Sequence, residues 1–188
     1  MSYDPAAIAG GGGAWTFIET VTVANQATVE MDLTGTHKMY MAHIDNLVPI
    51  TDDRELWLRF STDAGSTFLA STNYSWALNG SRGTGASFFD AQATSKINLS
   101  GNATGTMGTA TIESLNGFVY IHNANKTTKA VHATSDIVMS DAGVGTIAGW
   151  VGGGALIANI DEVDAIQFIA ETGNLDTGRI TLYGLNLS

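Results

Sequence analysis

The chain contains no cysteine among its 188 residues. Disulfides, thiolate zinc sites and cysteine nucleophiles are therefore excluded. Because small secreted domains often carry disulfides, their absence favours assembly in a reducing cytoplasm. The first residues show neither the basic nor the apolar region of a signal peptide, and no apolar run reaches the roughly 18 residues of a membrane span. We therefore expect no membrane partner.

Charged residues are also scarce. Asp, Glu, Lys and Arg make up 14% of the chain, against roughly 25% in ordinary soluble domains. The net charge of −10 argues against binding to nucleic acid or anionic lipid, which both require clustered cations. Thr, Ser, Asn and Gly must cover much of the surface, which suits close contacts between subunits and predicts a homo-oligomer.

Motifs that carry chemistry are missing as well. The chain has no Gly-x-Ser-x-Gly elbow and no phosphate-binding loop, and its histidines lack metal-ligand spacing. Two acidic clusters, Asp52-Asp53-x-Glu55 and Asp161-Glu162-x-Asp164, have oxygen ligands suitable for Ca²⁺, but solvated turn carboxylates are the favoured interpretation. We predict a protein that is not an enzyme, with no catalytic residue, metal or cofactor. The histidines, predicted to be structural, are His37, His43, His122 and His132.

Segments of alternating or β-branched apolar residues dominate the chain, and no window of a dozen residues keeps a helical stripe. The pattern predicts an all-β fold, an antiparallel β-sandwich of jelly-roll type with about eight to ten strands, as one domain over 15–188. Lys38–Ile44 is apolar on both faces and is expected to be central. The other predicted strands are Thr16–Val23, 29–33, Leu56–Phe60, Thr109–Leu115, Phe118–His122, Ala130–Met139, Ala165–Ala170 and Gly178–Leu187.

Turn signals separate these strands. Asn116-Gly117 predicts a tight hairpin, the strongest short-range signal of that kind. Gly184 marks a slip in apolar phase and predicts a bulge. Turn clusters are expected at 71–75, 79–87, 100–108 and 140–154, and the Gly-rich stretch around Trp150 is expected to be a long loop or hairpin tip.

Residues 1–14 form a predicted N-terminal arm with a linker at Gly10–Gly13, because four consecutive glycines cost too much entropy inside a regular element. A frayed terminus is one interpretation of the arm. The other is a peptide that orders against a neighbouring subunit. The candidate subunit contacts are Tyr3, Pro5, Ile8 and Trp15.

Ser61-x-Asp63-x-Gly65-x-Thr67 resembles the Asp-box, a β-hairpin signature of many extracellular and viral β-proteins. The resemblance implies that the Asp and Ser/Thr side chains bond the turn backbone. It therefore implies a structural turn and not an active site.

Six aromatic residues are candidates for stacking on sugar rings. Packing in the core or at a subunit interface is the favoured alternative. The candidates are Trp15, Trp57, Trp76, Trp150, Tyr74 and Tyr183.

The segment Tyr40–Phe68, with its Ile44-Asp45-Asn46-Leu47-Val48-Pro49 lead and its Glu55-to-Asp63 core, resembles a family of small virion proteins of tailed bacteriophages, as does the closing Gly178–Leu185. The resemblance implies a non-enzymatic virion structural protein, first a capsid decoration or cement protein that stabilises capsomer contacts. Its partners would be the major capsid protein or tail proteins.

A tail or fibre component is one alternative, and a carbohydrate-binding module for host-surface glycans is another. An aromatic strip on an exposed face would favour the glycan module, whereas an apolar patch with an ordered arm would favour the structural protein.

Overall fold

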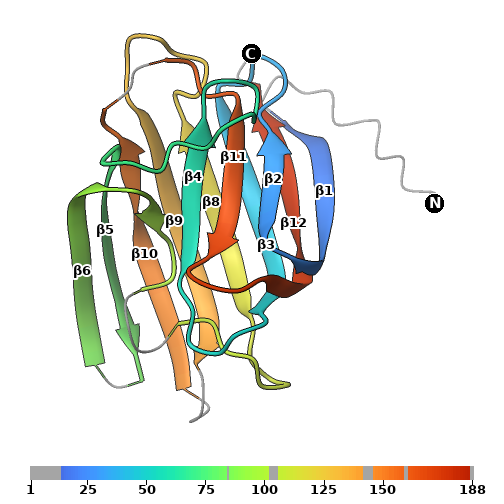
Figure 1. The fold of residues 1–188 in the computed structure, drawn as a ribbon, viewed down its shortest axis with the longest axis vertical. Coiled ribbons are helices and arrows are strands. Elements are labelled where there is room, and N and C mark those ends of the chain that lie inside the picture. The colour runs from blue at the N-terminus through green and yellow to red at the C-terminus, as the bar shows by residue number, and fades with distance from the viewer. Residues whose placement is uncertain (1–13, 84, 102–105, 142–145, 159–160, 187–188) are drawn as a thin grey trace, which may run out of the picture.

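The computed structural model describes residues 14–83, 85–101, 106–141, 146–158 and 161–186, and these contain no helix. They form twelve antiparallel strands in two sheets (Figure 1). The all-β sandwich is therefore confirmed, with more strands than the eight to ten predicted. The jelly-roll variant of the sandwich stays a prediction.

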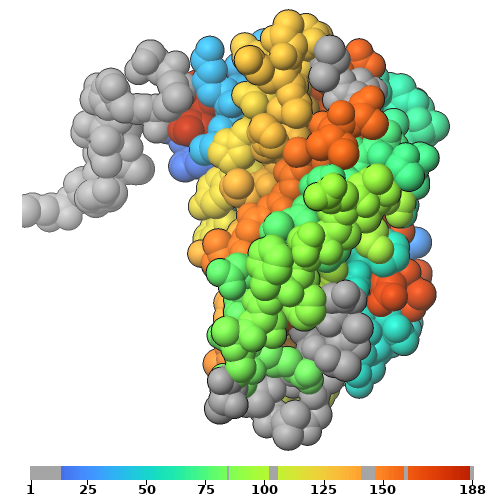
Figure 2. Space-filling view, turned by 90° about the vertical axis from the view of Figure 1, so that its left-hand side faces the viewer, coloured from blue at the N-terminus to red at the C-terminus, as the bar shows by residue number. Residues whose placement is uncertain are grey.

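The two sheets differ in width. The larger sheet contains, in spatial order, β1 (Trp15–Gln26), β12 (Leu175–Leu185), β3 (Met39–Pro49), β8 (Leu115–His122), β9 (Val131–Asp141), β10 (Thr146–Leu156), β5 (Tyr74–Arg82) and β6 (Gly85–Thr94). The smaller sheet contains β2 (Thr28–Asp32), β11 (Ala165–Ala170), β4 (Leu56–Ser61) and β7 (Ile97–Asn98). Figure 1 shows β4, β11 and β2 lying over the middle of the larger sheet, with β5 and β6 beyond their edge. Seen from that edge, the β5–β6 hairpin (green) crosses the molecule beside β10 (orange) (Figure 2).

The core fills the space between the sheets with alternate residues of each strand. In β3, Tyr40, Ala42 and Ile44 are fully buried, whereas Met41 and His43 point to the opposite face and are half-buried. This pattern follows from the two-residue period of a strand. The strand expected from Lys38–Ile44 is central in the larger sheet, as predicted.

A buried tyrosine joins the two sheets. The Tyr74 hydroxyl, from β5, accepts the amide hydrogen of Phe60 in β4 at 2.9 Å and donates to the Leu69 carbonyl at 2.9 Å. Burial raises the pKa of Tyr74 to about 12. The phenol is therefore neutral, and both of its polar contacts compensate for its removal from water.

The Asn116-Gly117 hairpin and the strand over Thr109–Leu115 were wrong predictions. Both residues of the dipeptide lie inside β8, which begins at Leu115. Here β3 carries an extra residue between Ile44 and Leu47, and the Asn116 side chain accepts the Asn46 amide hydrogen at 2.9 Å. Gly117 has a φ of 152°, and a Cβ there would collide with the Asp136 carbonyl of β9. The glycine thus serves close strand packing and not a turn.

The bulge predicted at Gly184 was also misplaced. β12 keeps regular pairing with β3 through Gly184, and the extra residue of this region is Ile18 in β1. A Cβ at Gly184 would run into the ring of His37. The glycine therefore makes room for that imidazole.

The turn clusters at 79–87 and 140–154 do separate strands, β5 from β6 and β9 from β10, but they were predicted far too long, because these strands occupy most of both ranges. Trp150 lies buried in β10 and not in a loop. At Gly152, Gly153 and Gly154 an added Cβ would meet the carbonyl oxygens of neighbouring strands within 3 Å. Close packing against β5 and β9 requires glycines in this strand, and glycines do not produce the apolar alternation by which a strand is recognised in a sequence. The sequence pattern therefore did not predict β10.

These contacts predict that Gly153→Ala is destabilising by about 1–3 kcal/mol, because the new methyl group would overlap the Ala133 carbonyl oxygen. Chemical denaturation of the purified protein measures the effect. Gly149→Ala in the same strand is the matched control, since a Cβ at Gly149 has nothing within 4 Å. Its free energy of unfolding should stay within about 0.5 kcal/mol of wild type. Equal stability of the two variants would contradict the packing argument.

Candidate functional site

The Ser61–Thr67 turn is held by its own side chains. The Ser61 hydroxyl accepts the amide hydrogens of Asp63 and Gly65 at 3.2 and 3.0 Å. The Asp63 carboxylate accepts the Thr67 amide at 2.8 Å and the Thr67 hydroxyl at 2.6 Å. Gly65 has a φ of 72°, which favours glycine. The four residues singled out in the sequence thus meet in one hydrogen-bonded turn.

The turn does not form a hairpin, however. It follows β4 in the smaller sheet, and the next strand is β5 in the larger one. No strand follows at Phe68, where the second arm of a hairpin would begin, although the Leu69 amide donates to the Phe60 carbonyl at 2.9 Å. Because the chain must cross from one sheet to the other, the two arms of the turn cannot pair as neighbours.

The predicted acidic clusters take part in local contacts. Asp52 accepts the Thr109 amide at 3.2 Å, Glu55 accepts the Trp57 indole N–H at 2.6 Å, and Asp164 accepts the Ala64 amide at 2.7 Å. The described residues include no group of three or more His, Asp or Glu side chains that could hold a metal ion. Asp52 and Asp164 thus bond backbone amides distant in the chain, whereas Glu55 bonds a neighbouring indole.

The histidines are spread over strands and a loop. His122 pairs with His132 across β8 and β9, and burial, together with the nearby His132, lowers the pKa of His122. His43 stacks on Phe118, with ring centroids 4.9 Å apart. His37 contacts Tyr40 edge to face at 5.4 Å.

One row of paired residues crosses all eight strands of the larger sheet on the side away from the smaller sheet. We call this side the outer face. Directly paired residues share a face, so the row defines which side chains point outward. Its members from β1 to β6 are Thr20, Thr181, His43, Phe118, Asp136, Val151, Asn79 and Phe88.

Aromatic rings gather on one half of the outer face, over β1, β12, β3 and β8. Trp15 lies 6.3 Å from Tyr120, Phe118 also lies 6.3 Å from Tyr120, and Phe17 meets Tyr183 edge to face at 6.2 Å. Half-buried Met41 separates Tyr183 from Tyr120 in the strand order. We call these residues the aromatic cluster: Trp15, Phe17, His43, Phe118, Tyr120 and Tyr183.

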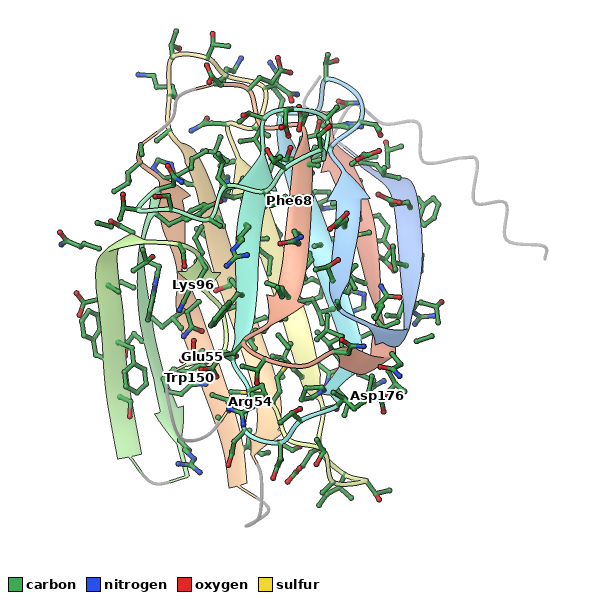
Figure 3. The ribbon with its side chains drawn as sticks, viewed as in Figure 1. Arg54, Glu55, Phe68, Lys96, Trp150 and Asp176 are labelled. Carbon is green, nitrogen blue, oxygen red and sulfur yellow. The ribbon has the colours of Figure 1, made fainter. Side chains whose placement is uncertain are left out.

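Of the six aromatics proposed for sugar stacking, Trp15 and Tyr183 belong to this cluster. Tyr74, Trp76 and Trp150 lie in the core. Trp57 lies on the smaller sheet, where the Lys96 ammonium lies 3.9 Å from its ring centroid. Lys96 and Glu55 are both seen to the left of β4 in Figure 3. Sequence reasoning missed Phe17, Phe118 and Tyr120. Their two-residue spacing within each strand was the available signal.

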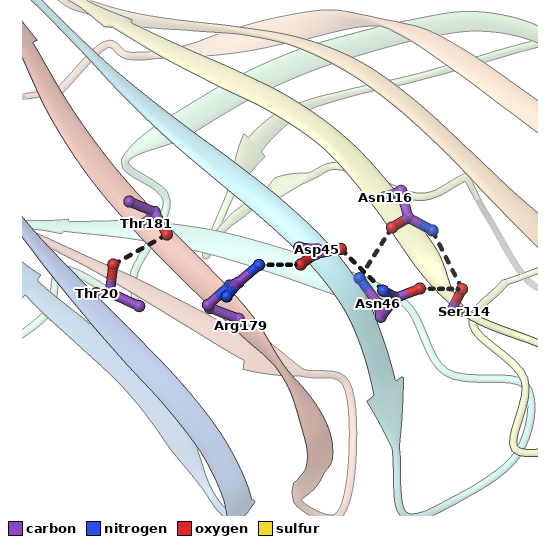
Figure 4. Close-up of polar contacts among 7 residues, drawn as sticks. All are labelled: Thr20, Asp45, Asn46, Ser114, Asn116, Arg179 and Thr181. Atoms are coloured by element: carbon purple, nitrogen blue, oxygen red, sulfur yellow. Dashed lines mark hydrogen bonds and ion pairs between the residues drawn. The ribbon is translucent and has the colours of Figure 1, made fainter. Parts of the chain in front are cut away.

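A polar network lies beside the aromatic cluster (Figure 4). Arg179 of β12 forms an ion pair with Asp45 of β3, and Asp45 accepts a hydrogen bond from the Asn46 side chain at 2.8 Å. The network continues through Asn116 to Ser114 at 3.1 Å, while Thr20 donates to Thr181 at 3.0 Å. These groups satisfy one another, so the network fixes the relative positions of β1, β12, β3 and β8.

The sequence matches no protein-family model, and no curated protein or solved structure is significantly similar to it. None of the described segments is a helix long and apolar enough to cross a membrane. The resemblance to phage virion proteins thus stays a prediction.

The turn predicts a pH-dependent contribution of Asp63 to stability. The Thr67 hydroxyl, the Thr67 amide and the Ser61 hydroxyl lower the pKa of Asp63. Its stabilisation is therefore complete above the ordinary Asp pKa of about 4, and it is lost as pH falls through the lowered folded value. Asp63→Ala should reduce the melting temperature at neutral pH, and this difference from wild type should shrink below about pH 4.

Asp63→Asn is the control, since the amide keeps one acceptor oxygen without a titrating charge. The difference in melting temperature between Asp63→Asn and Asp63→Ala should not change between pH 7 and about pH 3. A wild-type advantage over Asp63→Ala that is the same at both pH values would contradict the assignment.

Proposed function

We propose that the protein is a structural protein of a tailed-phage virion, a capsid decoration or cement protein that acts without catalysis. The observation that carries the proposal is the aromatic cluster on the outer face. An exposed aromatic strip was also the feature expected of a glycan-binding module, but the rings pack against one another and lie beside Met39 and Met41, which favours a protein partner. Phe17 is 60% exposed, and Trp15 and Phe118 are each 38% exposed. Soluble monomers rarely expose contiguous apolar surface of this kind, and such surfaces mark interaction sites.

The composition of the cluster suits a protein partner. Aromatic and methionine side chains are enriched at interface cores, where Lys, Glu and Asp are depleted. The rings supply large apolar area at low entropy cost, as at binding hot spots. Met39 and Met41 are half-buried beside the rings and add adaptable apolar surface.

The arm adds a second contact in this proposal. Trp15 opens β1 and is also a member of the aromatic cluster, so the described part of the chain begins at the edge of that cluster. The predicted contacts Tyr3, Pro5 and Ile8 lie outside the described residues. The proposed assembly unit is the cluster of one subunit together with the arm of a neighbour.

The jelly-roll variant of the sandwich and a location in the virion, after assembly in the host cytoplasm, belong to the same proposal. A tail or fibre component is the runner-up, because such a part would use the same apolar face. The partners would be other copies of this chain and the major capsid protein or tail proteins.

Deleting residues 1–13 should leave the melting temperature nearly unchanged but reduce incorporation into particles. The buried core of the described residues begins at Val23. A partner surface must offset the roughly 1–2 kcal/mol per residue that ordering the arm costs. Quantitative immunolabelling of purified virions measures occupancy. Wild-type occupancy of the truncated protein would show that the arm makes no assembly contact.

Phe118→Ser should likewise reduce occupancy, because it removes a ring at the centre of the aromatic cluster. Ile112→Ser is the matched control, as Ile112 is 75% exposed in the loop before β8 and touches no ring of the cluster. Equal loss in both variants, or no loss in either, would count against this face as the assembly surface. Absence of the wild-type protein from virions would overturn the proposed function as a whole.

A further inference from the structure

The other half of the outer face, over β9, β10, β5 and β6, is hollowed, and Phe88 of β6 is an exposed ring on it. Two shallow depressions lie along β10, of about 520 and 390 Å³. The first is lined by Gly149 and the second by Gly153, with Val151 between the two glycines. We call them the first and second depressions.

The same three kinds of polar group line both depressions. The first has a carboxylate, an amide and a hydroxyl from Asp136, Asn79 and Ser81. The second has the same set from Asp90, Gln92 and Ser75. None of these six side chains makes a hydrogen bond or ion pair with another residue in the described part of the chain, whereas the groups of the neighbouring polar network are satisfied. The depressions therefore present free donors and acceptors to a ligand.

Apolar side chains complete the walls. Val138 and Val151 border the first depression, and Val151 is 59% exposed. Phe88, at 65% exposure, borders the second and is paired directly with Asn79 of the first. Each depression thus offers an apolar wall next to hydrogen-bonding groups.

Gly149 has no packing reason to be glycine. A Cβ there would have nothing within 4 Å, whereas a Cβ at Gly152, Gly153 or Gly154 would collide with a neighbouring strand. A glycine inside a strand is destabilising, and where packing does not require it, it can mark the close approach of a ligand. Any larger residue at 149 would fill the first depression.

We propose that the two depressions bind a neutral oligosaccharide. Sugar hydroxyls would pair with the free carboxylate, amide and serine groups, and the C–H faces of the rings would rest on Val151 and Phe88. No Lys or Arg lines either depression, and each contains a carboxylate, which disfavours phosphorylated or acidic sugars. Gly149 and Gly153 are four residues apart, about 13 Å along an extended strand, so a ligand that reaches both depressions must be an oligomer.

The test titrates the purified protein with neutral oligosaccharides of two to six units, from glucan, mannan, galactan and N-acetylglucosamine series, by calorimetry and NMR. The wild type should bind the oligosaccharides of at least one series. It should bind the corresponding monosaccharide at least tenfold more weakly than these oligosaccharides. Gly149→Val should weaken that binding at least tenfold with an unchanged or higher melting temperature, because a Cβ at 149 has nothing within 4 Å and the branched side chain takes up the space of the depression. Asp136→Asn should also weaken it.

Thr22→Val is the matched control, a β-branched replacement at an exposed position of β1 far from both depressions. It should bind as the wild type does. Phe17→Ser, in the aromatic cluster on β1, should also keep sugar binding. The outcome of the sugar test is therefore independent of the assembly role of the aromatic cluster.

Three outcomes would overturn the proposal: no neutral series binds the wild type, Gly149→Val binds as tightly as the wild type, or only acidic sugars bind. A fourth comes from analytical ultracentrifugation without sugar. If the wild type dimerises and Gly149→Val is monomeric, a second copy of the chain occupies the depressions instead.

Discussion

The structure depends on burying the inner face of an eight-stranded sheet beneath a second sheet of four strands. The apolar residues of β3, β4, β8 and β11 meet in this layer, and each square ångström removed from water contributes roughly 25 cal/mol. The smaller sheet is too narrow to reach every strand of the larger one. Trp150, Phe89 and Leu78 therefore extend the core towards the β5–β6 hairpin, where β7 packs against β10 and β5.

The described strands form only two sheets, so none of them covers the outer face of the larger sheet, and the two halves of this face differ in chemistry. Over β1, β12, β3 and β8 the rings are exposed while the adjacent polar groups are paired with one another. Over β9, β10, β5 and β6 the surface is hollowed, and its carboxylates and amides make no side-chain contact within the described residues. An apolar surface with satisfied polar groups suits a protein partner, whereas free polar groups beside apolar walls suit a hydroxylated ligand.

Glycine has three separate roles in this chain. Gly65 adopts the positive φ of a turn that leads from one sheet to the other. Gly117 and Gly153 let neighbouring backbones approach closely, since a Cβ at either would strike a carbonyl oxygen. Gly149 has neither a positive φ nor a close backbone neighbour, unlike these three glycines. Its third role, in the proposed ligand site, is inferred from this contrast with Gly152, Gly153 and Gly154 in β10.

Sequence alone determined the all-β class, the strands with clear alternation such as β2, β3 and β4, and the residues of the Ser61–Thr67 turn. Each of these rests on local periodicity or on contacts within seven residues. Only the tertiary structure decided the roles of Asn116-Gly117, Gly184 and the glycines of β10. Each of these residues packs closely against a segment that is distant in the sequence. It also decided which aromatic residues are exposed: Trp150 and Trp76 are covered from the other sheet, while Phe118 and Phe17 are not. Composition gives a ring its hydrophobicity, but whether that ring becomes core or surface depends on which side of the sheet the second layer covers.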